Sequence, residues 1–112
     1  VLHPHSVNAT VLSRRLDGAL VLSDYELLKA FPGVDSHEYT VRVPVFANDQ
    51  NIERLAARIE TWMDDHGDVP GYLIAGHGFY TWGASVSDAL RHVEAFEFLF
   101  ECELRMRGAS PP

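Results

Sequence analysis

The sequence predicts an α/β domain in which helices cover a sheet, and three observations lead to this prediction. Segments rich in β-branched and aromatic residues alternate along the chain with segments whose apolar residues recur at helical spacing. Glycine, proline and N-capping residues stand between these segments. Hydrophobic residues make up 46% of the chain and charged residues 22%, as is typical of a globular protein. Strands and helices that alternate in this way build layers around one sheet.

The first two predicted elements are a strand and a helix. Residues 1–5 alternate apolar and polar side chains and predict a short strand. Residues 6–16 predict a helix that Ser6 or Asn8 can cap. Its expected apolar face consists of Val7, Val11 and Leu12. The chain begins in the middle of a predicted strand and without an initiator methionine, so we expect further residues to precede it in the native protein.

Two strands and a short helix are predicted next. Asp17-Gly18 is a turn signal before a short apolar strand at residues 19–22. Asp24 is expected to cap a helix that runs to Phe31, where Pro-Gly stops it. Residues 39–46 place apolar side chains two apart and predict a longer strand.

Two longer helices flank a further pair of predicted strands, at residues 71–75 and 79–82. Asn51 is expected to cap the first helix and Gly67 to end it. Its apolar stripe is Ile52, Leu55, Ala56, Ile59, Trp62 and Met63. Ser85 is expected to cap the second helix, with Asp88 completing a partial capping box. Its stripe is Ala89, Val93, Phe96, Phe100 and Leu104. Residues 108–112 are expected to form a frayed tail after a structured region at 1–107.

Charge and hydropathy narrow the classes of partner. The net charge of −7 makes nucleic acid an unfavourable partner, because the phosphate backbone is also negative. Nothing approaches the roughly 18 consecutive apolar residues that a membrane span needs, so no membrane association is expected. The lone Cys102 cannot form an intrachain disulfide, is expected in the core, and fits a reducing compartment.

Three histidines are the candidate metal ligands. His3 and His5 are two residues apart, and on a strand this spacing puts both imidazoles on one face. His77 lies between two glycines at the end of an apolar strand and could supply a third ligand. Three protein ligands and an open position are typical of catalytic zinc. The alternatives are a polar edge-strand face for the first two and a core histidine for the third.

Glu26 is the candidate acid–base residue. Its apolar neighbours could hold the carboxylate near a dry cleft and raise its pKa, although a solvated glutamate is the common alternative. The remaining histidines, His37, His66 and His92, are expected at the surface. The aromatic set Phe96, Phe98 and Phe100 is expected in the core or at a subunit contact.

Two stretches of the sequence resemble a known family. "LHPHSVNATVLSR" at 2–14 resembles the His-x-His-Ser stretch of class II aldolase and adducin-like proteins. "GYLIAGHGFYTWGASVSDALRHVEAFEFLFECEL" at 71–104 is similar to the C-terminal signature of a dehydratase branch of that family. The resemblance covers nearly all of this chain but only the C-terminal half of the family domain, which is a layered α/β/α structure. It therefore implies that residues 1–107 are part of a class II aldolase-like domain.

The resemblance implies a site and a reaction. His3, His5 and His77 match the family's zinc ligands, and Glu26, in "DYELLKAF", matches its catalytic glutamate more loosely. The implied activity is dehydration of a five-carbon ketose 1-phosphate that carries a methylthio group, a step of methionine salvage. Another sugar-phosphate aldolase or epimerase and a non-catalytic, adducin-like association module are the alternatives, because one metal site serves several reactions. The intact set of His3, His5 and His77 speaks against the association module, since a pure scaffold has no need of it.

The resemblance also implies partners. Relatives are rings of identical subunits, usually tetramers, with the active site at the interface, so a cytoplasmic homo-oligomer is expected and Tyr80 and Trp82 could lie near a neighbour. The family binds its substrate's phosphate with loops of its N-terminal half, and no Gly-rich phosphate loop is found in this sequence. Either that half belongs to the native protein or the chain is a degenerate relative without activity.

Overall fold

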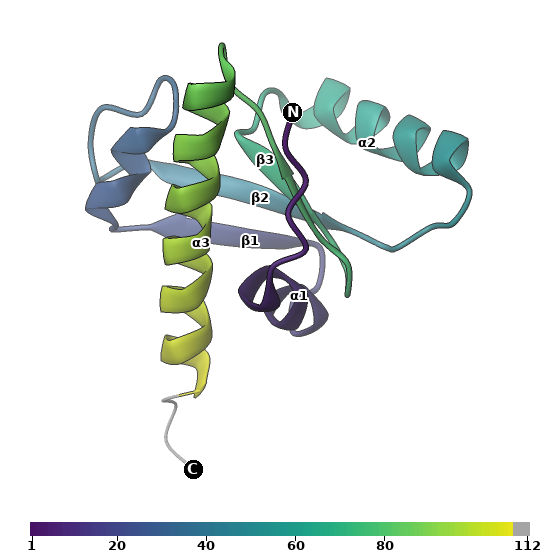
Figure 1. Ribbon diagram of the computed structural model, residues 1–112, viewed down its shortest axis with the longest axis horizontal. Coiled ribbons are helices and arrows are strands. Elements are labelled where there is room, and N and C mark those ends of the chain that lie inside the picture. The colour runs from purple at the N-terminus through teal and green to yellow at the C-terminus, as the bar shows by residue number, and fades with distance from the viewer. Residues whose placement is uncertain (109–112) are drawn as a thin grey trace.

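The computed structural model describes residues 1–108 and contains a four-stranded sheet with the order β1-β2-β3-β4 (Figure 1). The strands are β1 (Ala19–Ser23), β2 (Thr40–Phe46), β3 (Gly71–Ile74) and β4 (Gly78–Thr81). β2 and β3 are parallel, while the two outer pairs are antiparallel. The predicted α/β class is confirmed, with a sheet of mixed direction.

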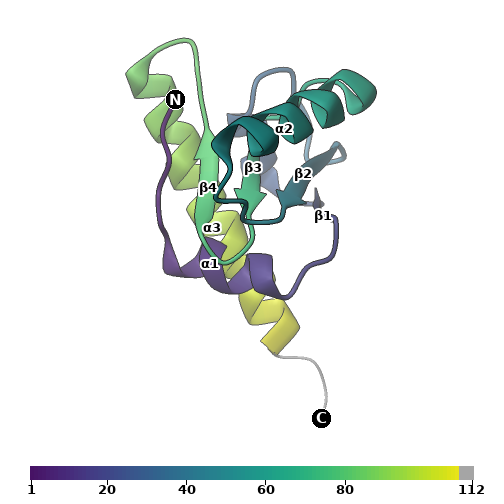
Figure 2. The ribbon, with the colours of Figure 1, turned by 90° about the vertical axis from the view of Figure 1, so that its right-hand side faces the viewer.

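Helices cover both faces of this sheet. They are α1 (Val7–Arg14), the 3₁₀ helix η1 (Glu26–Ala30), α2 (Ile52–His66) and α3 (Val86–Gly108). α2 connects the parallel strands β2 and β3, which need a crossover of this kind. Figure 2 shows α2 in front of the strands and α3 behind them. The arrangement matches the expected α/β/α layering.

Three helix starts follow from capping residues that the sequence indicated. The side-chain oxygens of Ser6, Asn51 and Ser85 each accept a hydrogen bond from the backbone N–H three residues later, at 2.9, 3.1 and 3.1 Å. These bonds satisfy N–H groups that the first helical turn leaves without partners. The predicted capping roles of Ser6, Asn51 and Ser85 are confirmed.

The expected cap at Asp24 is wrong. Asp24 takes a left-handed conformation with φ of 64°, and the N-cap of η1 is Tyr25, which makes no side-chain capping bond. The left-handed backbone at Asp24 turns the chain after β1, a conformation that aspartate tolerates better than most residues. The helix that follows is consequently a short 3₁₀ turn of five residues rather than an α-helix.

The core lies between the sheet and the pair α1 and α3. Odd-numbered side chains of β2, such as Val41 and Val43, are buried in it and belong to the same hydrophobic cluster as the fully buried Phe96 and Phe100 of α3. Most of the predicted α3 stripe is thereby confirmed. The expected α1 face is confirmed at Leu12 but wrong at Val7 and Val11, which are 78% and 44% exposed, because the helix turns Ala9 and Ser13 inward with Leu12.

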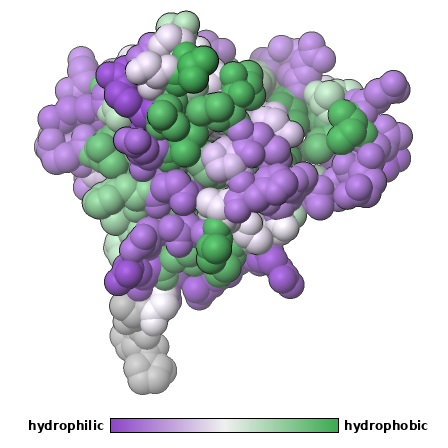
Figure 3. All heavy atoms as spheres, in the orientation of Figure 1, coloured by the Kyte–Doolittle hydropathy of each residue, from purple (hydrophilic) through white to green (hydrophobic). Residues whose placement is uncertain are grey.

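The opposite face of the sheet is covered less completely. No residue of α2 is buried, although its apolar stripe has helical spacing. Phe46 of β2 packs edge-on against Trp62, with ring centroids 6.2 Å apart, while Ile52 is 71% exposed. Figure 3 shows further hydrophobic side chains at the surface around the N-terminus and the first turns of α3.

The N-terminal segment, residues 1–5, extends the sheet beyond β4. Leu2 and Thr81 exchange both backbone hydrogen bonds, at 2.8 and 3.1 Å, and Phe79 donates to the Pro4 carbonyl at 3.2 Å. The extended conformation was predicted, but the pairing amounts to one isolated bridge, at Leu2. Pro4 has no N–H to donate, which limits the ladder at this edge.

The far end of the chain bears on two further expectations. α3 runs through Gly108, one residue into the predicted tail, and the rest of that tail lies outside the described residues. Among residues 1–108, none of the helices combines the length and the apolar character that crossing a bilayer requires.

Candidate metal centre

The three candidate ligands come from two segments that lie side by side. His3 and His5 belong to the N-terminal segment, and His77 belongs to the turn between β3 and β4. Gly78 allows this approach, because a Cβ at that position would collide with the carbonyl oxygen of Pro4. The glycine that follows His77 is therefore needed for close passage of the N-terminal segment.

The imidazoles converge on one point. Each offers a nitrogen, and the three nitrogens lie within 4.8 Å of one another. The Nε2 atom of His3 is 3.3 Å from that of His77 and 3.1 Å from that of His5. The rings meet edge to face, with centroids 4.7 to 4.9 Å apart. The predicted grouping of His3, His5 and His77 is thus present in the structure.

Hydrogen bonds on the other ring nitrogens determine the tautomers. The Nδ1 atom of His3 is 2.8 Å from the carbonyl oxygen of Phe79, and that of His77 is 3.3 Å from the side-chain oxygen of Asn48. The Phe79 oxygen can only accept, so Nδ1 of His3 carries the hydrogen, and with the Asn48 oxygen turned toward His77, as in this structure, Nδ1 of His77 carries it as well. In the neutral rings the Nε2 atoms of His3 and His77 then present lone pairs to each other and cannot share a hydrogen bond. A cation between them would remove this repulsion.

The spacing fits zinc. A zinc–nitrogen bond of about 2.05 Å and a tetrahedral angle place two ligand nitrogens about 3.3 Å apart. The Nε2 separations of 3.3 and 3.1 Å match that value. Burial, followed by the neighbouring His3 and His5, lowers the pKa of His77, which keeps this imidazole neutral as a metal ligand must be.

The ring of Tyr80, on β4, packs against one face of the His3 imidazole. The two rings are stacked, with centroids 3.8 Å apart and planes inclined by 14°. Tyr80 also stacks on Tyr72 of β3, at 5.0 Å. The aromatic pair limits the directions in which the His3 ring can tilt, and the Phe79 carbonyl fixes its rotation.

Glu26 does not join the histidines. It follows β1, at the opposite edge of the sheet from the N-terminal segment, and Figure 1 shows η1 (blue) beyond α3. Its carboxylate pairs with Lys29 at 2.7 Å and with His37 at 3.3 Å, and its side chain is 74% exposed. The expectation of a raised pKa is wrong for this chain, because the hydrogen bond and charge of Lys29 lower the pKa of Glu26.

The remaining singled-out residues divide between core and surface. The expected surface position of His92 is wrong, because it is 3% exposed and its Nδ1 lies 2.6 Å from the Trp82 carbonyl. His66 is exposed at the end of α2, as predicted. Cys102 is half-buried rather than in the core, and Phe98 is exposed, unlike its neighbours Phe96 and Phe100.

A hollow of about 780 Å³ lies away from the histidines, between the end of α2, the loop after η1 and the start of α3. Trp62, Trp82 and His92 are among its lining residues, and none of the three clustered histidines is. The metal-ligand geometry and this hollow are therefore separate features. The histidine cluster itself lies at the surface, where His5 is exposed and the other two are half-buried.

Comparison with known proteins identifies related sequences. The family model described as the class II aldolase and adducin N-terminal domain matches residues 1–104. Relatives named methylthioribulose-1-phosphate dehydratase include that of Pseudomonas paraeruginosa, 67% identical over 98% of this chain, and that of Azotobacter vinelandii, 65% identical over 96%. The corresponding protein of Pseudomonas aeruginosa strain PAO1 is 66% identical over 98% of the chain. These alignments cover 54%, 53% and 54% of the relatives, so the chain spans about half of their length.

Proposed function

The chain belongs to the class II aldolase and adducin family, and from this premise we propose that it forms the metal-binding part of a zinc-dependent hydro-lyase. The observation that carries the proposal is the convergence of three imidazoles whose ligand nitrogens lie within 4.8 Å of one another, with His3 Nε2 at the spacing of zinc ligands from the Nε2 atoms of His5 and His77. His3, His5 and His77 would hold the ion and leave a position open for substrate. A structural site would instead be closed by a fourth protein ligand.

The proposed substrate is methylthioribulose 1-phosphate, on the strength of the relatives' names. Dehydration removes a proton from the third carbon and hydroxide from the fourth, which leaves as water. The resulting enol then takes the diketo form at carbons two and three. This reaction would place the protein in methionine salvage. The phosphate would be held by the part of the relatives that this chain does not span.

The histidines would fix the position of the reacting carbons. When bound, zinc supplies Lewis acidity to the oxygens of the substrate. The hydrogen bonds from Nδ1 of His3 and His77 keep each Nε2 directed at the same point. The Tyr80 ring beneath His3 holds that imidazole in place before any substrate arrives. The chain thus prepares the ligand geometry before the reaction begins.

Glu26 is proposed as the residue that takes the proton and returns it to the leaving hydroxyl. Neighbouring strands lie about 4.8 Å apart, so β1 and the N-terminal segment are separated by about 19 Å across the sheet. Glu26 follows β1, and its carboxylate contacts Lys29 and His37 rather than the histidine cluster. We therefore propose that Glu26 of one chain lies beside the histidines of another chain. This placement requires a homo-oligomer of subunits that bind the sugar phosphate, and we propose that assembly as well.

Turnover of methylthioribulose 1-phosphate by the intact protein, measured together with its zinc content, tests the activity. The chain of 112 residues on its own is expected to be inactive. Loss of turnover on chelation and its return with zinc are the expected results. An intact, zinc-loaded protein that leaves this substrate unchanged would contradict the assignment.

Subunit mixing tests the position of Glu26. Protein with His77→Ala and protein with Glu26→Gln are each expected to be inactive. Unfolding and refolding them together creates contacts between an intact histidine cluster and an intact Glu26 on different chains. Recovery of part of the activity is the expected outcome, whereas mixed oligomers without any activity would argue that both groups act within one chain.

A further inference from the structure

We propose that Asn48 is a positioning residue for the metal centre, acting through His77. Its side-chain oxygen lies 3.3 Å from Nδ1 of His77 and accepts that hydrogen. The contact places the hydrogen on Nδ1 and the lone pair on Nε2, the atom that faces His3. This inference rests on the proposed zinc site and assigns one side chain that sets its geometry.

The topology of the sheet brings Asn48 to His77. β2 and β3 are parallel, and their last residues, Phe46 and Ile74, are partners in the register. Ala75 donates a backbone hydrogen bond to the carbonyl of Phe46 at 2.9 Å, which keeps the two strand ends together. Asn48 follows the carboxyl end of β2, and His77 follows the carboxyl end of β3, at the same end of the sheet. Their side chains meet there although they are 29 residues apart in the sequence.

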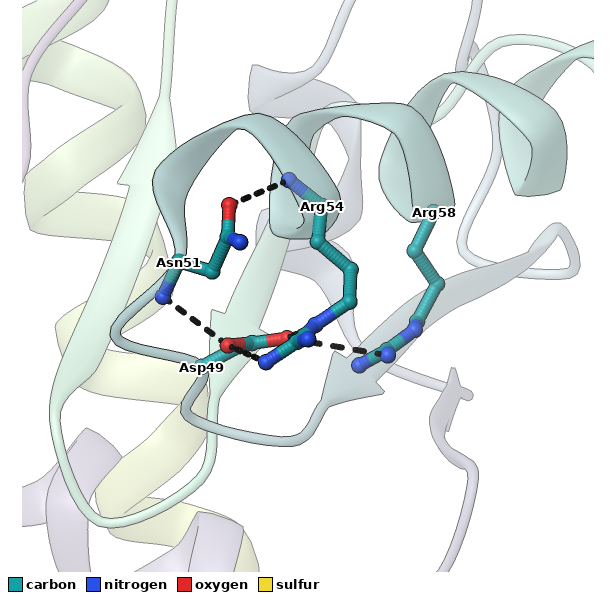
Figure 4. Close-up of polar contacts among 4 residues, drawn as sticks. All are labelled: Asp49, Asn51, Arg54 and Arg58. Carbon is teal, nitrogen blue, oxygen red and sulfur yellow. Dashed lines mark hydrogen bonds and ion pairs between the residues drawn. The ribbon is translucent and has the colours of Figure 1, made fainter.

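The loop that carries Asn48 is held by a second set of contacts, which Figure 4 shows. The Asp49 carboxylate accepts from Nε and Nη2 of Arg54 at 2.5 and 2.8 Å and from the backbone N–H of Asn51 at 2.9 Å. Arg58 lies within 3.7 Å of the same carboxylate. The Asp49 side chain is 10% exposed, and these donors lower its pKa to about 2, so it stays ionised at neutral pH.

These contacts of Asp49 form a clamp that holds the backbone next to Asn48. A two-pronged arginine–carboxylate contact constrains both distance and orientation. Asn51 caps α2 with its side chain while its backbone donates to Asp49, so the loop and the first turn of the helix are joined. Asn48 stands between this clamp and the end of β2, and its side-chain oxygen faces His77.

The chemistry of an amide suits this role. Hydrogen-bond acceptors on the outer nitrogen of a ligating histidine orient the ring and increase its basicity. The Phe79 carbonyl does this for His3 and belongs to the backbone, where no side-chain substitution removes it. The Asn48 amide does it for His77 without adding a negative charge to the neutral ligand set. The structure thus offers one side chain through which the geometry can be altered without removing a ligand.

Zinc binding by the intact protein tests the proposal, with a chromophoric chelator as competitor. Asn48→Leu removes the acceptor at similar side-chain size and is expected to weaken zinc binding by about 10- to 100-fold. Asn48→Asp keeps an oxygen at the same place and is expected to restore most of the affinity. Asn51→Ala is the matched control, because it alters the same loop and the helix cap but leaves the Asn48 oxygen.

Nitrogen NMR of histidine-labelled protein supplies a readout that loop stability alone would not move. In the zinc-bound wild type, His77 should show hydrogen on Nδ1 and metal on Nε2, and Asn48→Leu should shift the Nδ1 resonance and speed its hydrogen exchange. Unchanged zinc affinity in Asn48→Leu would overturn the role of Asn48 and leave the metal site standing. An equal loss in Asn51→Ala would also overturn it, in favour of loop integrity. Absence of zinc binding by the wild type would overturn the proposed site itself.

Discussion

The two outer edges of the sheet hold their candidate functional groups in different ways. At the β4 edge, Nε2 of His3 lies 3.1 and 3.3 Å from the Nε2 atoms of His5 and His77, and the Nδ1 atoms of His3 and His77 are hydrogen-bonded to oxygens of the protein. At the β1 edge, Glu26 is exposed on a short 3₁₀ helix and pairs with Lys29, whose side chain is also exposed. The first arrangement is complete within this chain, whereas the second presents a carboxylate to its surroundings.

The two kinds of group differ in how precisely their positions need to be fixed. Metal ligands need fixed positions, because an octahedral or tetrahedral ion tolerates little error in its bond lengths. An acid–base group needs to reach the proton, and its environment can be supplied by a second surface. The histidine edge is therefore expected to respond to substitutions of its supports, and the glutamate edge chiefly to changes in charge.

The largest expected effect removes a ligand. His77→Ala leaves two imidazoles, too few for a catalytic zinc site, so zinc should fall from about one ion per chain to background together with turnover. Elemental analysis of the purified intact protein measures this. His66→Ala is the matched control, since His66 is exposed on α2 outside the cluster, and it should keep its zinc. Full zinc occupancy in His77→Ala would mean that His77 is not a zinc ligand.

The next effect separates the two edges. Glu26→Gln keeps the size of the side chain but cannot take a proton, so turnover should fall by about 10² to 10⁴ while the zinc content is unchanged. Steady-state kinetics and metal analysis on the same preparation measure both. Glu38→Gln changes another exposed carboxylate near that edge and should be silent. Near-normal turnover in Glu26→Gln would mean that a different group transfers the proton.

A smaller effect is expected from a support of the histidine edge. Gly78→Ala places a Cβ against the Pro4 carbonyl, so the N-terminal segment must move away from β4 and carry His3 and His5 with it. A displacement of about 1 Å can lower a rate by about 10²-fold, and zinc affinity should fall with it. Chelator competition and kinetics measure the two losses. Gly108→Ala, where a Cβ meets no atom, is the control, and equal behaviour of the two variants would show the edge to be more tolerant than proposed.

The smallest effect concerns the charge beside Glu26. Lys29 lowers the pKa of this exposed carboxyl, so the carboxylate form persists to lower pH than in an isolated glutamate. Lys29→Ala should raise that pKa toward its ordinary value and move the acid limb of the kcat/KM profile to higher pH. The stability linked to the lowered pKa is lost as pH falls through it, and for an exposed pair that contribution is small. An acid limb that does not move would mean that another group controls it.

The histidine positions could be predicted from sequence because each depends on local rules. Strand alternation places His3 and His5 on one face, and the flanking glycines mark His77 as a point of close approach. Asn48 could not be found in this way, because its contact with His77 depends on the parallel register of β2 and β3. A signal was nevertheless present, since each residue comes two positions after the end of a predicted strand.

Two of the errors arise from tertiary packing, and a third arises from a local ion pair three residues along the chain. The sequence placed His92 at the surface, but the turn before α3 brings the Trp82 carbonyl to its ring. The helical spacing of apolar residues predicted α2 correctly as a helix. Burial of its apolar stripe depends on what packs against it, and no residue of α2 is buried. The apolar neighbours of Glu26 suggested a raised pKa, whereas the contact with Lys29 reverses the direction.

The path of the N-terminal segment along β4 has a consequence for folding. His3 and His77 are 74 positions apart in the sequence and yet in contact. An ion shared by them would act as a cross-link that closes most of the chain into a loop. In the chain-entropy treatment of such closures, a loop of this length lowers the entropy of the unfolded state by an amount worth about 4 kcal/mol. Bound zinc would then stabilise the fold as well as serve the reaction, and its removal is expected to weaken the attachment of residues 1–5 to β4 first.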